Sequence, residues 1–237
     1  MNKILITICG RGGSKGIPGK NIKEINKKPL IGYSIETAIS FSKLYPADIA
    51  LSTDSLEIKK TAAVFGLATE YVRPAKMATD DAGKLVVIKD LLAYYEHQNN
   101  IRYDYIIDLD ITSPLRTIDD LSIALKNLVG NNDAVNLFSV SNAHRNPYFN
   151  MVEEQTDGFY NLVKKGKFLT RQSAPKVYDL NASFYIFKRS FFENYTTSIT
   201  DKSIIYEMPH LCFDLDEPTD FDFLEFLLQE KKLNFKI

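Results

Sequence analysis

Apolar and polar positions along the chain follow two periods that alternate with each other. Nearly continuous short apolar runs predict strands over residues 3–9, 48–54, 68–74, 103–111 and 133–141. Apolar residues spaced three and four apart predict helices over residues 30–44, 56–66, 84–98 and 117–132. Strands that alternate with helices in this way favour a mostly parallel α/β sheet with crossover helices.

End signals support two of these helices. Ser55 is expected to cap the second helix, and Gly66 is expected to close it. For the third helix, the expected cap is Asp80 or Asp81.

The pattern changes near residue 143. Residues 143–178 are aromatic, charged and rich in turn residues, and residues 149–163 predict a hairpin that turns at Asp157–Gly158. The α/β pattern then returns, with strands expected over residues 181–189 and 204–216 and helices near Ser190 and over 220–232. We therefore expect one α/β domain over residues 1–237, with an inserted arm at about 143–178.

Composition narrows the possible partners. The chain has 45% hydrophobic and 25% charged residues and a net charge of -1, which is typical of a globular domain. This balance predicts no nucleic-acid partner, and the lack of an apolar run near 18 residues predicts no membrane partner. Two cysteines provide neither a disulfide framework nor a metal quartet. With no signal-peptide pattern, the expected compartment is the cytoplasm.

A glycine-rich, cationic loop, CGRGGSKGIPGKN at residues 9–21, follows the first strand. It is not a Rossmann fingerprint, because Lys15 stands at the third glycine position, nor a Walker A loop, because Ser14 stands at the first. Its glycines would still let backbone N–H groups approach phosphates, and Arg11, Lys15 and Lys20 supply positive charge. Since ligands of open α/β sheets bind beyond the carboxyl ends of strands, the loop predicts a polyphosphate site. The alternative is a flexible surface loop with solvated lysines.

Two carboxylates close the last expected strand. Asp214 and Asp216 are two residues apart, so on a strand both would project to the same side. Like charges this close favour a cation beside them, and Mg²⁺ takes carboxylate oxygens together with substrate phosphates. Alternatively, Asp216 caps the helix that begins near Glu217.

Several blocks of the chain, in order, resemble the N-acylneuraminate cytidylyltransferases (CMP-sialic acid synthetases) and their relatives for legionaminic and pseudaminic acids. The blocks are GRGGSKGIPGKNI, KPLIGYSIETA, LSTDSLEI, VRPAKMATDDAG, TSPLRT, NASFYIF and CFDLDEPTDFD. The resemblance implies a three-layer α/β nucleotidyltransferase fold, Rossmann-like and mostly parallel, with a protruding dimerisation element. It also implies transfer of CMP from CTP to the anomeric hydroxyl of a nine-carbon 2-keto sugar acid, with release of pyrophosphate.

The resemblance also implies roles for residues of this sequence. The nucleotide-binding residues would be Gly10, Arg11, Gly12, Gly13, Ser14, Lys15, Lys20, Asn21, Arg73 and Asp80. The catalytic residues would be Arg11, Lys20 and Asp214, and Mg²⁺ would be held by Asp214 and Asp216. The alternative for Asp80 is a helix cap, and for Arg116, in the TSPLRT block, a structural pairing residue.

On the sugar side, the resemblance points to Asp110, Thr112, Arg171, Gln172 and Asn181. Sialic-acid enzymes usually carry glutamine where this chain has Asp110. A carboxylate accepts hydrogen bonds but cannot donate them, which favours a variant sugar such as legionaminic acid. Lys84 stands near a position that is often serine in the family, and a helix-face lysine is the alternative interpretation.

The expected arm bears on assembly. It contains a group of apolar residues in a segment too short to have its own core: Phe159, Tyr160, Leu162, Phe168 and Leu169. Such a surface favours a partner, and the resemblance implies a homodimer with crossing arms. The alternative is an arm folded on its own domain. Two other functions stay open at this point: a nucleotidyltransferase for an eight-carbon ulosonate or a sugar 1-phosphate, and a non-catalytic nucleotide-binding protein.

Overall fold

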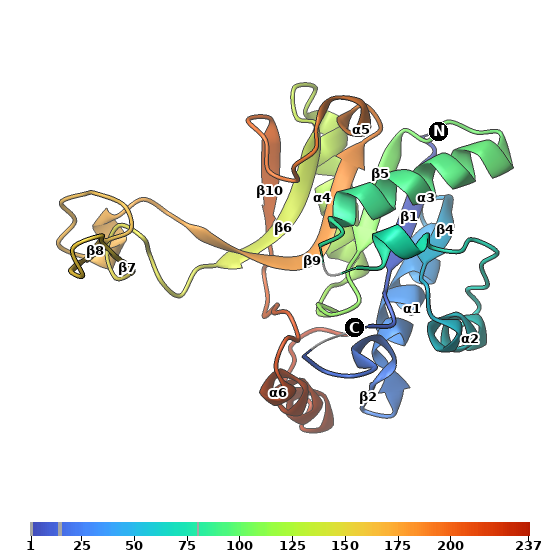
Figure 1. Ribbon diagram of the computed structural model, residues 1–237, viewed down its shortest axis with the longest axis horizontal. Helices are drawn as coiled ribbons and strands as arrows, with labels where there is room; N and C mark the ends of the chain where they lie inside the picture. Colours follow the sequence, from blue (N-terminus) through green and yellow to red (C-terminus); the bar gives the residue numbers. More distant parts are fainter. Residues whose placement is uncertain (1, 14–15, 80) are drawn as a thin grey trace.

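The structure, a computed structural model, describes residues 2–13, 16–79 and 81–237. Its centre is a six-stranded sheet with the strand order β10-β6-β9-β5-β1-β4 (Figure 1). These strands are β1 Ile4–Cys9, β4 Ala47–Ser52, β5 Tyr105–Leu109, β6 Asn136–Asn142, β9 Tyr178–Lys188 and β10 Ser203–Glu207. Only β9 runs antiparallel to its neighbours, so the sheet is mostly parallel, as predicted.

Helices cover both faces of the sheet. They are α1 Leu30–Ser42, α2 Leu56–Val64, α3 Lys84–Asn99, α4 Ile118–Gly130, α5 Phe191–Asn194 and α6 Pro218–Gln229. Side chains alternate along β1, so Ile4, Ile6 and Ile8 pack in one core with α1 and α4, whereas Leu5 packs in a second core with α3 and α5. The predicted three-layer α/β architecture is confirmed.

The signals at the ends of α2 act as expected. Ser55 Oγ accepts a hydrogen bond from the Ile58 N–H at 3.4 Å, and Gly66 has a φ of +87°. For α3 the expected Asp81 cap is wrong, because the N-cap is Gly83 and no side chain caps it. Asp80 lies outside the described residues.

The strand expected over residues 68–74 is wrong. This segment has no regular structure and is tied to β4 by separate bonds, including one from the Arg73 N–H to the Thr53 carbonyl oxygen at 3.2 Å. Pro74, which follows, has no N–H with which to continue a ladder. Tyr71 and Arg73 are buried and Val72 between them is exposed, so the segment has the alternation of a strand although no strand forms.

The last strand is shorter than expected. β10 ends at Glu207, and the strand expected over 204–216 is wrong beyond that residue. The Met208 N–H still reaches the Val140 carbonyl oxygen at 2.9 Å, but Pro209 cannot donate to a ladder. Residues 208–217 are thus irregular and lead to α6, whose N-cap is Glu217 rather than Asp216.

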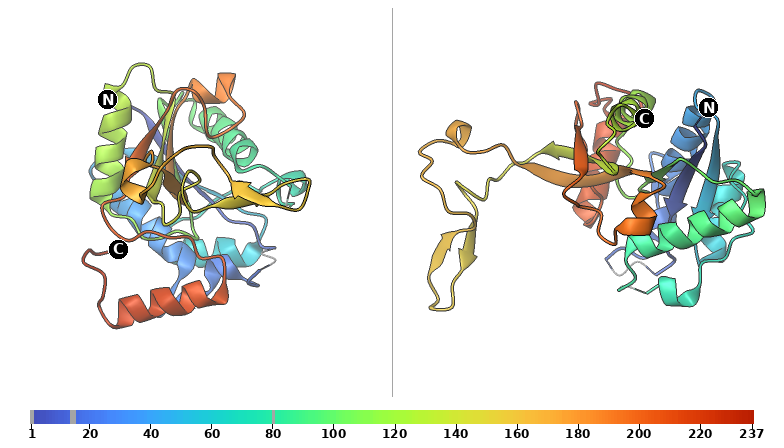
Figure 2. Two further views of the ribbon diagram at one scale, coloured as in Figure 1. Left: turned by 90° about the vertical axis from the view of Figure 1, so that its left-hand side faces the viewer. Right: turned by 90° about the horizontal axis from the view of Figure 1, so that it is seen from above.

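Between β6 and β9 the chain forms an arm that projects from the sheet (Figure 1; Figure 2, right). Near its tip β7 Val152–Glu154 pairs with β8 Tyr160–Leu162, and Gly158 takes a φ of +81° in the turn. The predicted hairpin is confirmed. The remaining short elements are η1 Lys20–Ile22, β2 Glu24–Ile25, β3 Lys28–Pro29, η2 Ala75–Met77 and η3 Arg171–Ser173. Among the described residues, no helix combines the length and apolar character needed to cross a membrane.

The register of the parallel strands brings three loops to one edge. Cys9 at the end of β1 pairs with Ser52 at the end of β4, and Ile8 pairs with Leu109 at the end of β5. The segments after these three strands therefore share the carboxyl edge of the sheet, where ligands of α/β proteins bind.

Candidate active site

The start of the glycine-rich loop packs closely against neighbouring segments of the chain. The Gly10 N–H donates to the Ser52 carbonyl oxygen at 3.0 Å, and a Cβ at Gly10 would lie 2.7 Å from Ile111 Cδ1. Only glycine fits this approach without displacing the Ile111 side chain. The Gly12 N–H donates to Asp54 Oδ1 at 2.9 Å, while Gly13 has open space around it. The predicted contributions of Ser14 and Lys15 lie outside the described residues.

A cavity of about 450 Å³ opens beside this loop. Four of the residues expected to bind nucleotide line it: Arg11, Lys20, Asn21 and Arg73. The buried Asn21 donates from Nδ2 to the Arg11 carbonyl oxygen at 2.9 Å, which fixes the course of the loop. Arg73 is buried as well, and its Nε and Nη2 donate to the Oγ and the carbonyl oxygen of Ser52 at 3.0 and 2.7 Å. Both side chains thus hold the wall of the cavity in place.

The cationic loop (residues 9–21) and the acidic segment (residues 214–216) meet across this cavity. Lys20 Nζ lies 3.0 Å from Asp216 Oδ1 and donates to the Leu215 carbonyl oxygen at 2.6 Å. A hydrogen bond of 2.8 Å from the Leu215 N–H to the Thr112 carbonyl oxygen ties the acidic segment to the loop after β5. One molecule in the cavity could therefore contact Lys20 and Asp216 together.

Asp214 and Asp216 do not project to the same side, as a strand would have required. Asp216 lines the cavity of the glycine-rich loop, whereas Asp214 lines a neighbouring cavity of about 590 Å³. The reason is the irregular backbone after Pro209. The two carboxylates still influence each other, because burial together with the charges of Asp110 and Asp216 raises the pKa of Asp214.

At the carboxyl end of β5, Asp110 and Thr112 line the first cavity, as expected for sugar-binding residues. Asp110 has an unforeseen partner, because Lys84 Nζ lies 2.6 Å from its Oδ2 and 2.7 Å from Asp108 Oδ2. Burial alone would raise the pKa of Asp110, but Lys84 and the hydrogen bonds from Thr112 lower it to about 2. Lys84 is therefore more than a helix-face lysine, because it pairs with two aspartates at the end of β5.

Comparison with known proteins identifies the family of the chain. The family model described as cytidylyltransferase matches residues 5–235. The chain belongs to the cytidylyltransferase family. The resemblance noted in the sequence, the enzymatic activity class and the nucleotidyltransferase fold are thus confirmed.

Curated relatives of this cytidylyltransferase include a CMP-N,N'-diacetyllegionaminic acid synthase of Campylobacter jejuni. It is 43% identical over 237 residues, covering 100% of this chain and 99% of the relative. A post-translational flagellin modification protein B of Campylobacter coli has the same identity and coverage. A pseudaminic acid cytidylyltransferase of Campylobacter jejuni is 30% identical, with 95% and 96% of the two chains covered.

A solved structure of CMP:2-keto-3-deoxy-manno-octonic acid synthetase complexed with CTP has the same fold as this cytidylyltransferase. Its TM-score is 0.68 at 16% sequence identity, and the alignment covers 97% of this chain and 100% of that chain.

The other three residues expected on the sugar side lie apart from the first cavity. Arg171 and Gln172 line a cavity of about 560 Å³ at the base of the arm, where Arg171 donates to the Ala143 carbonyl oxygen. Asn181 is buried and lines the same cavity as Asp214. Its Oδ1 accepts from the Ser139 hydroxyl at 2.6 Å, next to the irregularity in the pairing of β6 with β9. Within one chain the structure therefore unites only Asp110 and Thr112 of the five.

The sequence left open whether Arg116 belongs to the substrate site or is a structural pairing residue, and the structure supports the second role. Its guanidinium is buried, donating to the carbonyl oxygens of Asp110 and Ser183 and to Ser34 Oγ, the last at 2.7 Å. Arg116 thereby joins the carboxyl end of β5 to α1 and β9. Burial lowers its pKa to about 10, so the guanidinium stays charged at neutral pH.

The cysteine in the cavity wall is not a nucleophile candidate. Partial burial and the nearby Asp108 carboxylate raise the pKa of the Cys9 thiol to about 12. The thiol is therefore protonated at neutral pH and acts as a small apolar group.

Proposed function

We propose that the chain transfers CMP from CTP to the anomeric hydroxyl of a nonulosonic acid, giving a CMP-sugar and pyrophosphate. The observation that carries this proposal is the contact of Lys20 with Asp216 across the cavity at the carboxyl edge of the sheet. A triphosphate needs cations and a metal-binding carboxylate on opposite sides, and this edge offers both.

The sugar we propose is of the legionaminic-acid type. A full-length relative at 43% identity is named for CMP-N,N'-diacetyllegionaminic acid, while the sequence is 30% identical to a pseudaminic acid cytidylyltransferase. The replacement of the sialic-acid enzymes' glutamine by Asp110 agrees with a sugar other than N-acetylneuraminate.

In the proposed complex the loop binds the triphosphate. Arg11 and Lys20 would contact the β- and γ-phosphates, helped by the backbone around Gly12 and Gly13, and by Lys15 in the undescribed part of the loop. Asn21 and Arg73, both in the cavity wall, would face the nucleoside. Lys20, Asn21 and Arg73 are held by hydrogen bonds before substrate binds, so catalysis would come chiefly from positioning and charge neutralisation.

Asp214 and Asp216 are the proposed holders of Mg²⁺, and their chemistry fits this ion. They offer hard carboxylate oxygens on either side of Leu215. Burial, and then the charges of Asp110 and Asp216, raise the pKa of Asp214, and a cation would offset that charge. Among the described residues no group of three or more potential ligands forms a metal site, so substrate phosphates would complete the coordination. When bound, Mg²⁺ would neutralise phosphate charge and polarise the α-phosphate.

The reaction is a displacement at the α-phosphorus. The anomeric oxygen forms a bond to this atom, the bond to the bridging oxygen of pyrophosphate breaks, and the hydroxyl proton is released. Arg11 and Lys20 would stabilise the negative charge that collects on the leaving pyrophosphate. Asp110 and Thr112 would position the acceptor sugar near the end of β5.

The sugar site is proposed to be completed in a homodimer. Arg171 and Gln172 lie at the arm, away from the first cavity, so a second copy could bring these residues to it. The exposed apolar side chains of the arm would then be covered by the partner. The predicted compartment stays the cytoplasm.

The test is pyrophosphate release from CTP and Mg²⁺ with a panel of acceptors. The panel holds N,N'-diacetyllegionaminic, pseudaminic, N-acetylneuraminic and 2-keto-3-deoxy-manno-octonic acids. We expect release with the legionaminic derivative to be fastest. Release only with the eight-carbon acid would replace the proposed substrate class, and CTP binding without release from any acceptor would indicate a nucleotide-binding protein.

A further inference from the structure

Lys84 is the first residue of α3, and its ammonium lies between two carboxylates at the end of β5. Nζ is 2.7 Å from Asp108 Oδ2 and 2.6 Å from Asp110 Oδ2. A lysine at this position faces the positive end of the helix dipole, so the helix itself disfavours it. The two aspartates are what stabilise a cation here.

The aspartates are themselves fixed. Asp108 is fully buried, and its Oδ1 accepts a hydrogen bond from Thr7 Oγ1 at 2.8 Å. Asp110 Oδ1 accepts from the N–H and the Oγ1 of Thr112, each at 2.9 Å. The remaining oxygen of each carboxylate therefore lies beside Lys84 Nζ, at 2.7 Å for Asp108 and 2.6 Å for Asp110.

One donor of this ammonium is left over. An ammonium has three N–H groups. One donates to Asp110 Oδ2, and Asp108 Oδ2 lies within ion-pair distance of Nζ, at 2.7 Å. In the part of the chain that the structure describes, no third hydrogen-bond acceptor contacts Nζ, and its nearest ring, Tyr185, is 5.8 Å away. The Lys84 side chain is 34% exposed and lines the same cavity as Arg11 and Lys20. Its third N–H is thus available to a molecule in that cavity.

We propose that Lys84 is a substrate-binding residue, which donates its third N–H to an anionic oxygen at the reacting end of the substrates. The proposal rests on the proposed function and deepens it. Two oxygens have this chemistry, one on the α-phosphate of CTP and one on the carboxylate of the sugar acid. Asp108 and Asp110 are then positioning residues, and the Lys84 ammonium offsets part of the negative charge that Asp110 presents to the acid group.

This pairing also joins two departures from the family pattern. Asp110 in place of glutamine and Lys84 near the position that is often serine are separate differences in the sequence, 26 positions apart, but in the structure they form one ion pair. Changing only one of them would leave a charge without its partner beside the substrate.

The first test compares Lys84→Met with Lys89→Met, since Lys89 is exposed on the same helix. We expect Lys84→Met to lower kcat/KM at least tenfold and Lys89→Met to leave it unchanged. Weaker CTP binding in calorimetry would assign the contact to the phosphate, whereas a higher KM for the sugar acid at unchanged CTP affinity would assign it to the carboxylate. Unchanged values for both substrates would overturn the proposal.

A second comparison separates substrate binding from charge neutralisation. It compares the double variant Asp108→Asn/Asp110→Asn with the triple variant that also carries Lys84→Met. Thermal unfolding verifies that both variants fold. If Lys84 only neutralises the aspartates, its loss has no further effect once they are neutral. We expect a further loss of at least tenfold in kcat/KM, and equal rates would overturn the proposal. Absence of turnover in the wild-type chain would instead refute the proposed function, and CTP calorimetry would still report on Lys84.

Discussion

Lys20 connects the cationic loop to the acidic segment of the site. Its ammonium contacts both the backbone and a side chain of the acidic segment, at 2.6 Å from the Leu215 carbonyl oxygen and 3.0 Å from Asp216. The side chain of Asp216 is 72% exposed, so this ion pair contributes little to stability. Its importance is positional, because it keeps a cation where the triphosphate is expected.

Lys20→Ala should lower the rate of pyrophosphate release by at least about tenfold. A charge-assisted hydrogen bond is worth roughly 1.5–3 kcal/mol, and about 1.4 kcal/mol in the transition state corresponds to a tenfold change in rate. The measurement is kcat under saturating CTP and sugar. Lys23→Ala is the matched control, since Lys23 is exposed nearby and does not line the cavity. A near-normal rate for Lys20→Ala would remove Lys20 from the catalytic residues.

Asp110→Gln should change the preference among acylated sugars more than the affinity for CTP. The glutamine amide can donate a hydrogen bond, which the carboxylate cannot, and it leaves Lys84 paired with Asp108 alone. The measurements are kcat/KM for each acid in the panel and calorimetric CTP binding. An equal change for every sugar would contradict the assignment of Asp110 to the sugar side.

Among the elements, the irregular segment 208–217 is the one that orders the site. His210 anchors it, with Nε2 at 2.9 Å from Asp120 Oδ2 and Nδ1 at 3.1 Å from the Leu211 carbonyl oxygen. Asp120 also accepts hydrogen bonds from Thr117 and Tyr206, as an ionised carboxylate does. A carboxylate and a carbonyl only accept, so both contacts are hydrogen bonds only when both ring nitrogens carry protons. Burial of the ring opposes its charge, but these hydrogen bonds raise the pKa of His210.

His210→Gln should therefore destabilise the protein more in mild acid than in alkali. A histidine with a raised folded-state pKa contributes fully below its unfolded pKa of about 6.5, and this contribution is lost as pH rises through the folded pKa. We expect a loss of about 1.5 kcal/mol or more at pH ~6, from hydrogen bonds to a charged group, and a smaller loss at pH ~9. Urea unfolding at both pH values measures it. His97→Gln, an exposed histidine on α3, should show no such difference. Equal losses at the two pH values would mean that His210 is neutral.

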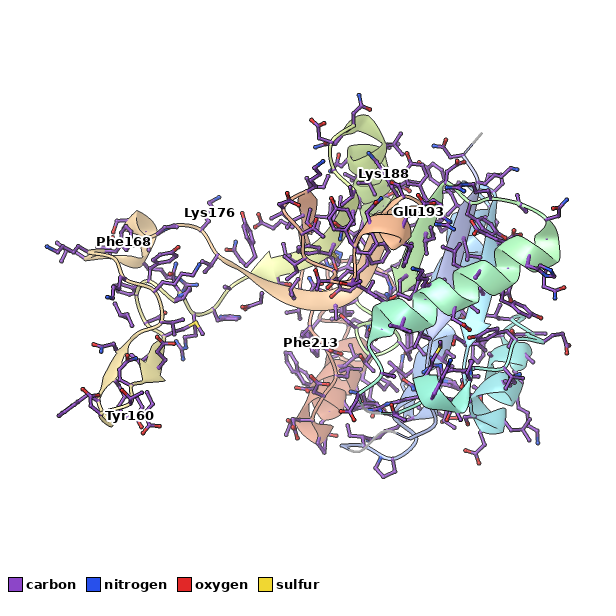
Figure 3. All side chains as sticks on the ribbon, turned by 45° about the horizontal axis from the view of Figure 1, so that its top comes forward. Tyr160, Phe168, Lys176, Lys188, Glu193 and Phe213 are labelled. Carbon is purple, nitrogen blue, oxygen red and sulfur yellow. The ribbon has the colours of Figure 1, made fainter. Side chains whose placement is uncertain are left out.

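At the scale of the whole molecule, the arm is the feature that the single chain leaves uncovered. Phe159, Tyr160 and Leu169 are 72%, 62% and 95% exposed. Figure 3 places Tyr160 and Phe168 at the far end of the arm, remote from Phe213 near the body of the molecule. Apolar side chains this exposed are typical of an interface, and the alternative of an arm folded back on its own domain is wrong for this chain.

Phe159→Asp combined with Leu169→Asp should shift the proposed dimer toward monomer in sedimentation velocity. Each substitution places a charge in a surface that a partner would have to desolvate. The control is Val64→Asp, because Val64 is 84% exposed on α2, at the opposite end of the molecule (Figure 1). A wild-type chain that sediments as a monomer at micromolar concentration would reject the dimer.

The arrangement of strands and helices could largely be predicted from the sequence, because buried strands and amphipathic helices have distinct periods. The two segments wrongly expected to be strands fail for the same reason. Residues 68–74 and 208–216 alternate in burial or polarity, but a strand also needs a continuous row of backbone partners. Pro74 and Pro209 remove donors where such rows would continue.

Local spacing and residue type are enough to predict the α/β class, the loop with Arg11 and Lys20, and the acidic pair. Which of these groups meet depends on the three-dimensional fold. Lys20 and Asp216 are 196 positions apart, and Lys84 reaches the end of β5 from a different helix. Such pairings follow from strand register and from the packing of α3 on the sheet, and a one-dimensional pattern contains neither.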